Sequence, residues 1–172
     1  MPIVPAERRT LVPILGVAAC VFLACVDPAD RRPGTWLSGE RAAGPVTDWS
    51  FTDEHPEIFI QVSTPYLIPH SVTIVCAALN GGLIVGARDP DTKRWPSYIE
   101  NDAEVRLKIG DRIYDQQLEL VEDPQTVDAI VRAYAAKYNR PVLPPEERPV
   151  VRYWRVVERR QGSPNRERTA RF

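Results

Sequence analysis

Apolar and polar residues alternate with a period of two along most of the chain after residue 56. Successive side chains of a strand point to opposite faces, so this period indicates half-buried strands. The alternation is most regular where Val105, Leu107 and Ile109 are interleaved with Arg106 and Lys108, which we expect to face outward. Together the apolar runs predict six strands, at residues 58–63, 70–78, 83–87, 104–109, 112–121 and 150–158.

Two tight turns connect some of these strands. Asn80-Gly81-Gly82 and Gly110-Asp111 each lie between apolar runs, and Asn and Gly tolerate the positive φ of a two-residue hairpin turn. Between the hairpins, residues 88–101 are polar, basic and aromatic, and they predict a long loop. Long loops in small β domains are more often functional than idle.

One segment has helical rather than strand periodicity. Asp123 is suited to cap a helix and Pro124 to occupy its first position, and Asn139-Arg140-Pro141 is suited to end it. An apolar face recurs at helical spacing in between, at Val127, Ile130, Val131, Tyr134 and Tyr138. The fold class predicted is mainly β (α+β), an antiparallel sheet with one packed helix.

The N-terminal segment resembles a targeting signal. Arg8 and Arg9 precede an apolar run over residues 11–26, and charged residues follow at once. This order is typical of an export signal, and the paired arginines also resemble a twin-arginine signal. Leu23-Ala24-Cys25 resembles a lipoprotein signal with Cys25 as the lipidated residue, and Cys20 is the alternative. An uncleaved anchor is equally compatible, and either form places the domain outside the cytoplasm, in the cell envelope.

The chain therefore divides into four predicted regions. Residues 1–25 form the signal or anchor, 26–55 an extended lead-in, 56–160 the β domain, and 161–172 a basic, disordered tail. Scattered apolar residues of the lead-in are expected to hold it on the domain surface: Trp36, Leu37, Trp49 and Phe51.

Composition excludes several classes of protein. The formal charge of −1 creates no global field for nucleic acid, and 17 prolines argue against a helical bundle. Three cysteines form no disulfide framework, and Cys76 is expected to be a buried thiol in an apolar strand. With only two histidines a zinc site has little support. No nucleophile elbow, phosphate loop or dinucleotide glycine motif is present.

Three segments together resemble a known family. They are KRWPSYIENDAEVRLKIGDR (93–112), AYAAKY (133–138) and VRYWRVVER (151–159). In this order they resemble the flavin-binding split β-barrels, chiefly the deazaflavin-dependent nitroreductase type and, more distantly, the pyridoxamine phosphate oxidases. The resemblance covers residues 56–160. It implies a six-stranded antiparallel split β-barrel, a homodimer, and FMN or a deazaflavin as cofactor, with reduction of a small quinone- or nitro-like acceptor.

The resemblance also implies a set of cofactor-binding residues. Arginine, lysine and hydroxyl side chains would contact the cofactor phosphate, and tryptophan would form an apolar wall beside the flavin ring. The matching positions are His70, Ser71, Thr73, Arg88, Lys93, Arg94 and Trp95. The alternative for the 93–95 cluster is a solvated loop with Trp95 as a lid on the barrel end. No catalytic residue is identified.

One departure from the family pattern keeps a second hypothesis open. Relatives of the nitroreductase type carry a basic, glycine-rich turn between the first two strands, whereas this chain has STPYLIPHS (63–71). That turn contains no lysine, arginine or glycine, and His70 is its one basic replacement. The alternative function is a cofactor-free envelope lipoprotein that binds a small ligand or a protein in the barrel groove.

Overall fold

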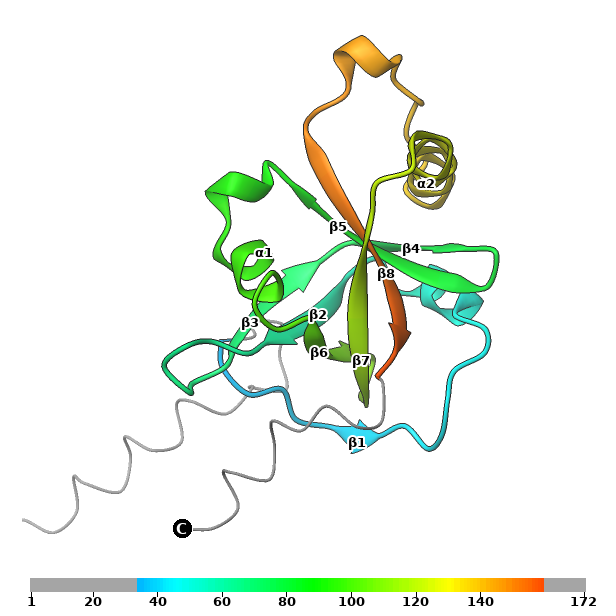
Figure 1. Ribbon diagram of the computed structural model, residues 1–172. Coiled ribbons are helices and arrows are strands. Elements are labelled where there is room, and N and C mark those ends of the chain that lie inside the picture. The colour runs from blue at the N-terminus through cyan, green and yellow to red at the C-terminus, as the bar shows by residue number, and fades with distance from the viewer. Residues whose placement is uncertain (1–33, 160–172) are drawn as a thin grey trace, which may run out of the picture.

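The computed structural model describes residues 34–159 (Figure 1). The predicted export signal, the lipidation candidates Cys20 and Cys25, and the basic tail lie outside the described residues. Within residues 34–159, no helix has the length and apolar character needed to cross a membrane.

All six predicted strands are present. They are β2 (Ile58–Val62), β3 (His70–Ile74) with β4 (Cys76–Leu79), β5 (Gly82–Arg88), β6 (Glu104–Ile109), β7 (Arg112–Val121) and β8 (Val151–Glu158). The strand predicted at residues 70–78 is divided at Val75 into β3 and β4. The division arises because its first half pairs with β2 and its second half with β5.

The strands form one coiled sheet in the order β3-β2-β6-β7-β8-β5-β4. Every neighbouring pair on this path is antiparallel. Its two end strands, β3 and β4, follow each other in the chain but do not pair, so hydrogen bonds do not close the sheet. The antiparallel sheet and the packed helix of the expected six-stranded split barrel are therefore present, but the sheet is not closed by hydrogen bonds and its end strands adjoin at Val75.

The predicted hairpin turns are confirmed. Asn80 and Gly81 both have positive φ, at 52° and 77°, and Leu79 pairs with Gly82 across the turn. Two consecutive left-handed residues define a turn whose twist matches that of the flanking strands. Gly110, with φ of 57°, makes the corresponding turn between β6 and β7.

The loop predicted at residues 88–101 is wrong for its second half. A 3₁₀ turn, η3 (Pro90–Thr92), leads into a short helix, α1 (Arg94–Ile99). Trp95 and Ile99, one helical turn apart, are buried and fix this helix over the core. A six-residue helix contains fewer than two turns, so its periodicity is too short to stand out in the sequence.

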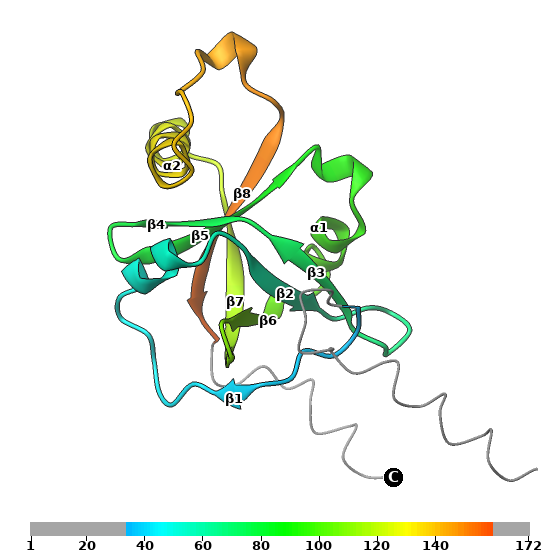
Figure 2. The same cartoon turned by 180° about the vertical axis from the view of Figure 1, so that it is seen from behind.

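The predicted long helix is confirmed as α2 (Pro124–Lys137), which lies against β4 (Figure 2). The Asp123 side chain accepts a hydrogen bond from the Thr126 backbone N–H, at 2.8 Å, and thus caps the helix. Ile130 is fully buried and anchors the apolar face. A further 3₁₀ turn, η4 (Pro145–Glu147), lies in the connection to β8.

The lead-in is part of the fold rather than a surface strap. It contains β1 (Glu40–Arg41), which pairs in parallel with β7, and the 3₁₀ helix η2 (Ser50–Glu54). Leu37 and Trp49 are 4% and 5% exposed, and Trp49 belongs to the main core. Trp36 and Phe51, in contrast, are partly exposed.

Two polar strand residues are buried, and for one of them, Lys108, the predicted outward orientation is therefore wrong. Ser71 is 2% exposed because the lead-in covers it: its backbone N–H donates to the Gly34 carbonyl and its hydroxyl to the Thr35 carbonyl. Lys108 is 9% exposed. The coverage of Ser71 by a distant segment is not visible in the alternation of its own strand.

Candidate functional site

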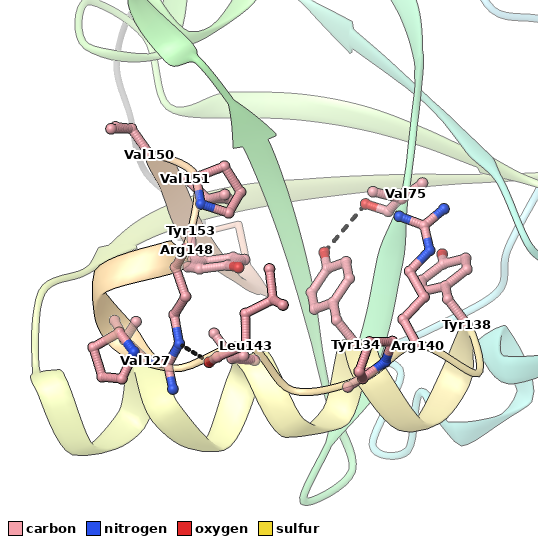
Figure 3. A pocket seen from close by; sticks show the side chains of 15 residues that line it. Val75, Val127, Tyr134, Tyr138, Arg140, Leu143, Arg148, Val150, Val151 and Tyr153 are labelled. Atoms are coloured by element: carbon pink, nitrogen blue, oxygen red, sulfur yellow. Dashed lines mark hydrogen bonds between the residues drawn. The ribbon is translucent and has the colours of Figure 1, made fainter.

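The main candidate site is a pocket between α2, the 138–150 connection and the sheet. Its volume is about 520 Å³, and we call it the tyrosine pocket (Figure 3). Its walls come from four segments. The residues that matter below are Val75, Tyr134, Tyr138, Arg140, Arg148 and Tyr153.

Three tyrosines shape the pocket. The Tyr134 and Tyr138 rings are stacked on α2, with centroids 5.9 Å apart, and the Tyr153 ring of β8 lies 5.7 Å from that of Tyr134. Figure 3 shows Tyr134 and Tyr153 approaching each other from the helix and the strand, with Leu143 beside them. Aromatic rings at this spacing provide flat apolar walls suited to a planar ligand.

The two helix tyrosines are fixed by their hydroxyls. Tyr134 donates to the Val75 and Ile84 carbonyls at 3.2 and 3.1 Å, and Tyr138 lies within 2.9 Å of the Cys76 and Pro56 carbonyls. Burial raises the pKa of Tyr134 well above its usual value and that of Tyr138 to about 12. Both hydroxyls therefore stay protonated at neutral pH and act as structural hydrogen-bond donors.

Tyr153 differs from the other two. Within the described residues its hydroxyl has no hydrogen-bond partner, although burial of the side chain raises its pKa. A neutral phenol without a protein partner beside an apolar wall can donate to, or accept from, a bound molecule.

Two arginines line the pocket with different roles. Arg148 donates to Asp128 Oδ1 at 2.5 Å and to the Leu143 carbonyl at 2.8 Å, so its charge is used to hold the 141–149 connection to α2. Arg140 lies over the Tyr138 ring, 6.0 Å from its centroid, and forms no ion pair within residues 34–159. Arg140 is thus the cation available to an anionic ligand.

A glycine sets the position of Tyr153. Gly86 of β5 pairs with Tyr153 of β8, and a Cβ at Gly86 would come within 3.0 Å of Tyr153 Cδ1. The ring therefore lies over a strand position that has no side chain. A glycine inside an apolar strand commonly marks such a close approach, and it was the sequence signal for this pocket that periodicity alone missed.

The fold brings one predicted site residue to the edge of the tyrosine pocket. Arg88, at the end of β5, pairs with the pocket residue Val151, and the next residue, Asp89, donates its N–H to the Val150 carbonyl at 2.9 Å. The Arg88 side chain is exposed and forms an ion pair with Asp89 at 3.4 Å.

Other predicted site residues gather at the opposite end of β3. Arg94 is close enough to His70 to lower its pKa, although burial is the larger cause of that shift. The His70 ring also meets the edge of the Tyr98 ring, at 6.2 Å. Lys93 and Arg94, which precede and begin α1, are exposed.

The remaining predicted residues do not converge with either group. Thr73 is exposed in the middle of β3, whereas Ser71 is buried with its hydroxyl bound to the lead-in. Trp95 is 4% exposed, belongs to the main core and packs on Trp154 with centroids 5.1 Å apart.

Cys76 is confirmed as a buried thiol. Its pKa is raised by burial, and Lys137 Nζ, 3.4 Å from the sulfur, only partly offsets this effect. Within residues 34–159, no group of three or more His, Cys, Asp or Glu side chains is placed to hold a metal ion.

Comparison with known proteins relates this architecture to solved structures. No protein-family model matches the chain, and no curated protein matches it by sequence. HutZ, the heme storage protein of Vibrio cholerae, is similar with a TM-score of 0.53 and 11% identity, over 64% of this chain and 87% of that one.

Two further structures are similar at TM-scores of 0.50 and 13% identity. One is a provisionally named pyridoxamine 5′-phosphate oxidase from Listeria innocua, covering 63% of this chain and 87% of that one. The other is a provisionally named 5-nitroimidazole antibiotic resistance protein from Bacteroides thetaiotaomicron, covering 62% and 75%.

The chain has the split-barrel fold. The resemblance noted in residues 93–112, 133–138 and 151–159 is thereby confirmed for the architecture. Identities of 11% and 13% establish the fold alone, because one fold supports many activities. The split-barrel chain must therefore be assigned a function from its own pocket.

Proposed function

We propose that this split-barrel protein binds a flavin- or deazaflavin-type cofactor and serves the reduction of a quinone- or nitro-like acceptor. The observation that carries the proposal is the tyrosine pocket, a cavity of about 520 Å³ with aromatic walls. The membrane tether outside the cytoplasm and the homodimer, both expected from the sequence, are part of the same proposal.

The residues present fit such a cofactor. The volume falls inside the range of about 300–1,000 Å³ that is usual for ligand pockets. Tyr134 and Tyr153 would face a planar ring, the Tyr153 hydroxyl would meet its polar edge, and Arg140 would pair with an anionic group. A bound flavin or deazaflavin supplies hydride transfer, and the chain's part is to hold the ring and exclude water.

The predicted contacts at the other end of β3 form a competing site. Val75 lines the tyrosine pocket, and His70 lies five residues earlier, about 16 Å away by the rise of a strand. Arg94 interacts with His70 there, and Lys93 precedes Arg94 at the start of α1. Their role as cofactor contacts remains a prediction, and substitutions distinguish the two locations.

Cofactor binding tests the proposal directly. The full-length protein in detergent is titrated with FMN and, separately, with reduced deazaflavin, and fluorescence quenching is recorded. Tyr153→Phe should lower the affinity for the cofactor about 3- to 10-fold, the change expected from the loss of one hydrogen bond. Arg140→Gln should weaken it further for the phosphorylated cofactor than for its unphosphorylated form, because the guanidinium pairs with the phosphate.

The matched control is Lys93→Gln with Arg94→Gln, which removes two exposed charges outside the tyrosine pocket. Undiminished affinity in this control, with loss in the pocket variants, places the cofactor in the tyrosine pocket. The reverse pattern would move the cofactor to the α1 end. A folded protein that binds neither cofactor would contradict the oxidoreductase proposal and favour the cofactor-free binding module.

A further inference from the structure

The turn between β2 and β3 contains three consecutive apolar residues whose side chains are exposed to solvent. Tyr66, Leu67 and Ile68 are 57%, 85% and 49% exposed, and we call them the apolar tip. Single exposed apolar residues are ordinary, but a contiguous exposed group marks an interaction surface. This tip occupies the place where the family pattern would have a basic turn.

The tip is held in a defined conformation rather than collapsed. The Thr64 hydroxyl donates to the Ile68 carbonyl at 2.6 Å, and the Leu67 N–H donates to the Thr64 carbonyl at 3.3 Å. Leu67 has a positive φ of 66°, a conformation unfavourable for a residue with a Cβ. The chain thus accepts backbone strain at the most exposed leucine of residues 34–159, and this strain fits a tip held in shape for contact.

The described chain begins beside this tip. Gly34 and Thr35 accept hydrogen bonds from Ser71, which follows the turn, and Figures 1 and 2 both show the blue start of the chain next to the β2–β3 connection. In the sequence, the apolar run of residues 11–26 ends eight residues before Gly34. Eight residues reach at most about 28 Å, so the predicted anchor ends within that distance of the base of the tip.

Aromatic and basic residues surround the tip. The Tyr66 and Tyr98 hydroxyls lie 3.2 Å apart, and His70 and Arg94 adjoin them. The carboxylate of Glu100 at the end of α1 is paired with Arg152, at 3.0 Å. Apolar side chains with tyrosines and an arginine at their base are the composition of a segment that rests in a lipid headgroup layer.

We infer that the apolar tip docks on a lipid surface. Leu67 and Ile68 enter the boundary between headgroups and acyl chains, and Lys93 and Arg94 face the lipid phosphates. This inference rests on the proposed membrane tether and is independent of the proposed cofactor. It fixes how the domain sits on the membrane: α2, which contributes a wall of the tyrosine pocket, lies away from the β2–β3 connection in both views (Figures 1 and 2).

The test uses the full chain in vesicles of phosphatidylcholine and phosphatidylglycerol with brominated acyl chains, which quench nearby fluorophores. An environment-sensitive fluorescent amino acid replaces Leu67 in one protein and Glu146, in η4, in the control, so that all three cysteines stay native. We expect about a twofold loss of emission at position 67 and none at position 146. With the probe at 67, Tyr66→Asp with Ile68→Asp should abolish the quenching while the protein still sediments with the vesicles.

Two results would overturn the inference. One is unquenched emission at position 67 in protein that sediments with the vesicles. The other is an emission spectrum at position 67 that shows a buried probe in detergent and that does not change on transfer to the brominated vesicles, which would indicate a contact between copies of the chain. Protein that fails to sediment with the vesicles would contradict both the membrane tether and the docking of the tip. The flavin titration tests the cofactor proposal independently of this result.

Discussion

Tyr138 connects the end of α2 to the sheet through one hydroxyl. Its oxygen lies 2.8 Å from the Pro56 carbonyl and 2.9 Å from the Cys76 carbonyl, and it accepts from the Cys76 N–H at 3.2 Å. Tyr138→Phe leaves these backbone groups without their partner, so we expect a loss of about 1–2 kcal/mol in the free energy of unfolding. Urea denaturation measures the loss.

Tyr153→Phe is the matched control for that stability measurement. Its hydroxyl has no partner within the described residues, so its removal should leave the urea midpoint unchanged while it weakens flavin binding. Equal destabilisation by the two substitutions would contradict the distinction between a structural and a ligand-facing tyrosine.

A substitution at Gly86 tests the shape of the pocket, because it adds one Cβ atom beside Tyr153. An added Cβ would meet Tyr153 Cδ1 and Cε1 at 3.0 and 3.1 Å, so Gly86→Ala should displace the ring from the strand towards the pocket. We expect cofactor affinity to fall at least several-fold with far-UV circular dichroism unchanged. Ala87→Gly, one residue along the same strand, is a control that alters the backbone without meeting Tyr153. Unaltered binding in Gly86→Ala would show that the ring position is unimportant.

At the scale of the element, α2 depends on its first turn to hold the pocket wall. Asp123 accepts hydrogen bonds from the Thr126 N–H at 2.8 Å and hydroxyl at 2.6 Å, and these bonds lower the pKa of its carboxyl. Asp123→Ala should therefore lower the melting temperature, and Asp123→Asn, which retains an acceptor but not the charge, should restore only part of it.

The depressed pKa of Asp123 also gives this effect a pH dependence. A carboxyl whose folded-state pKa lies below its usual value of 3.8 stabilises the fold above that value and loses the contribution as pH falls through the folded pKa. The difference in melting temperature between wild type and Asp123→Ala should thus shrink below about pH 4. A difference that persists in acid would mean that the carboxylate charge is not what caps α2.

For the molecule as a whole, the lead-in supplies buried residues that the β domain alone would lack. Leu37 and Trp49 are buried, Thr52 is fully buried, and Lys137 of α2 donates to the Thr52 carbonyl at 2.7 Å. Removal of a buried tryptophan alone costs about 3–5 kcal/mol. We expect a chain that starts at residue 56 to be insoluble or unfolded, whereas one that starts at residue 34 gives a cooperative thermal transition. A stable, folded 56–172 chain would contradict this role for the lead-in.

Local chemistry determined the elements that the sequence predicted correctly. Side chains alternate along strands, Asn80-Gly81 permits positive φ, and the Asp123-Pro124 pair begins a helix, so each element is specified by residues within a few positions of one another. The split-barrel architecture was predicted from the family resemblance of residues 93–112, 133–138 and 151–159. The short helix α1 was not predicted because six residues show too little periodicity to indicate a helix.

Only the tertiary structure decided what depends on distant segments. Ser71 is buried because residues 34 and 35 cover it, and His70 and Arg88, both predicted cofactor contacts, are placed at different sites by different strand pairings. The tyrosine pocket joins Val75, α2 and β8, which lie far apart in the chain. Strand register and helix packing bring such residues together through contacts across the whole chain, and alternation within one segment carries no record of them.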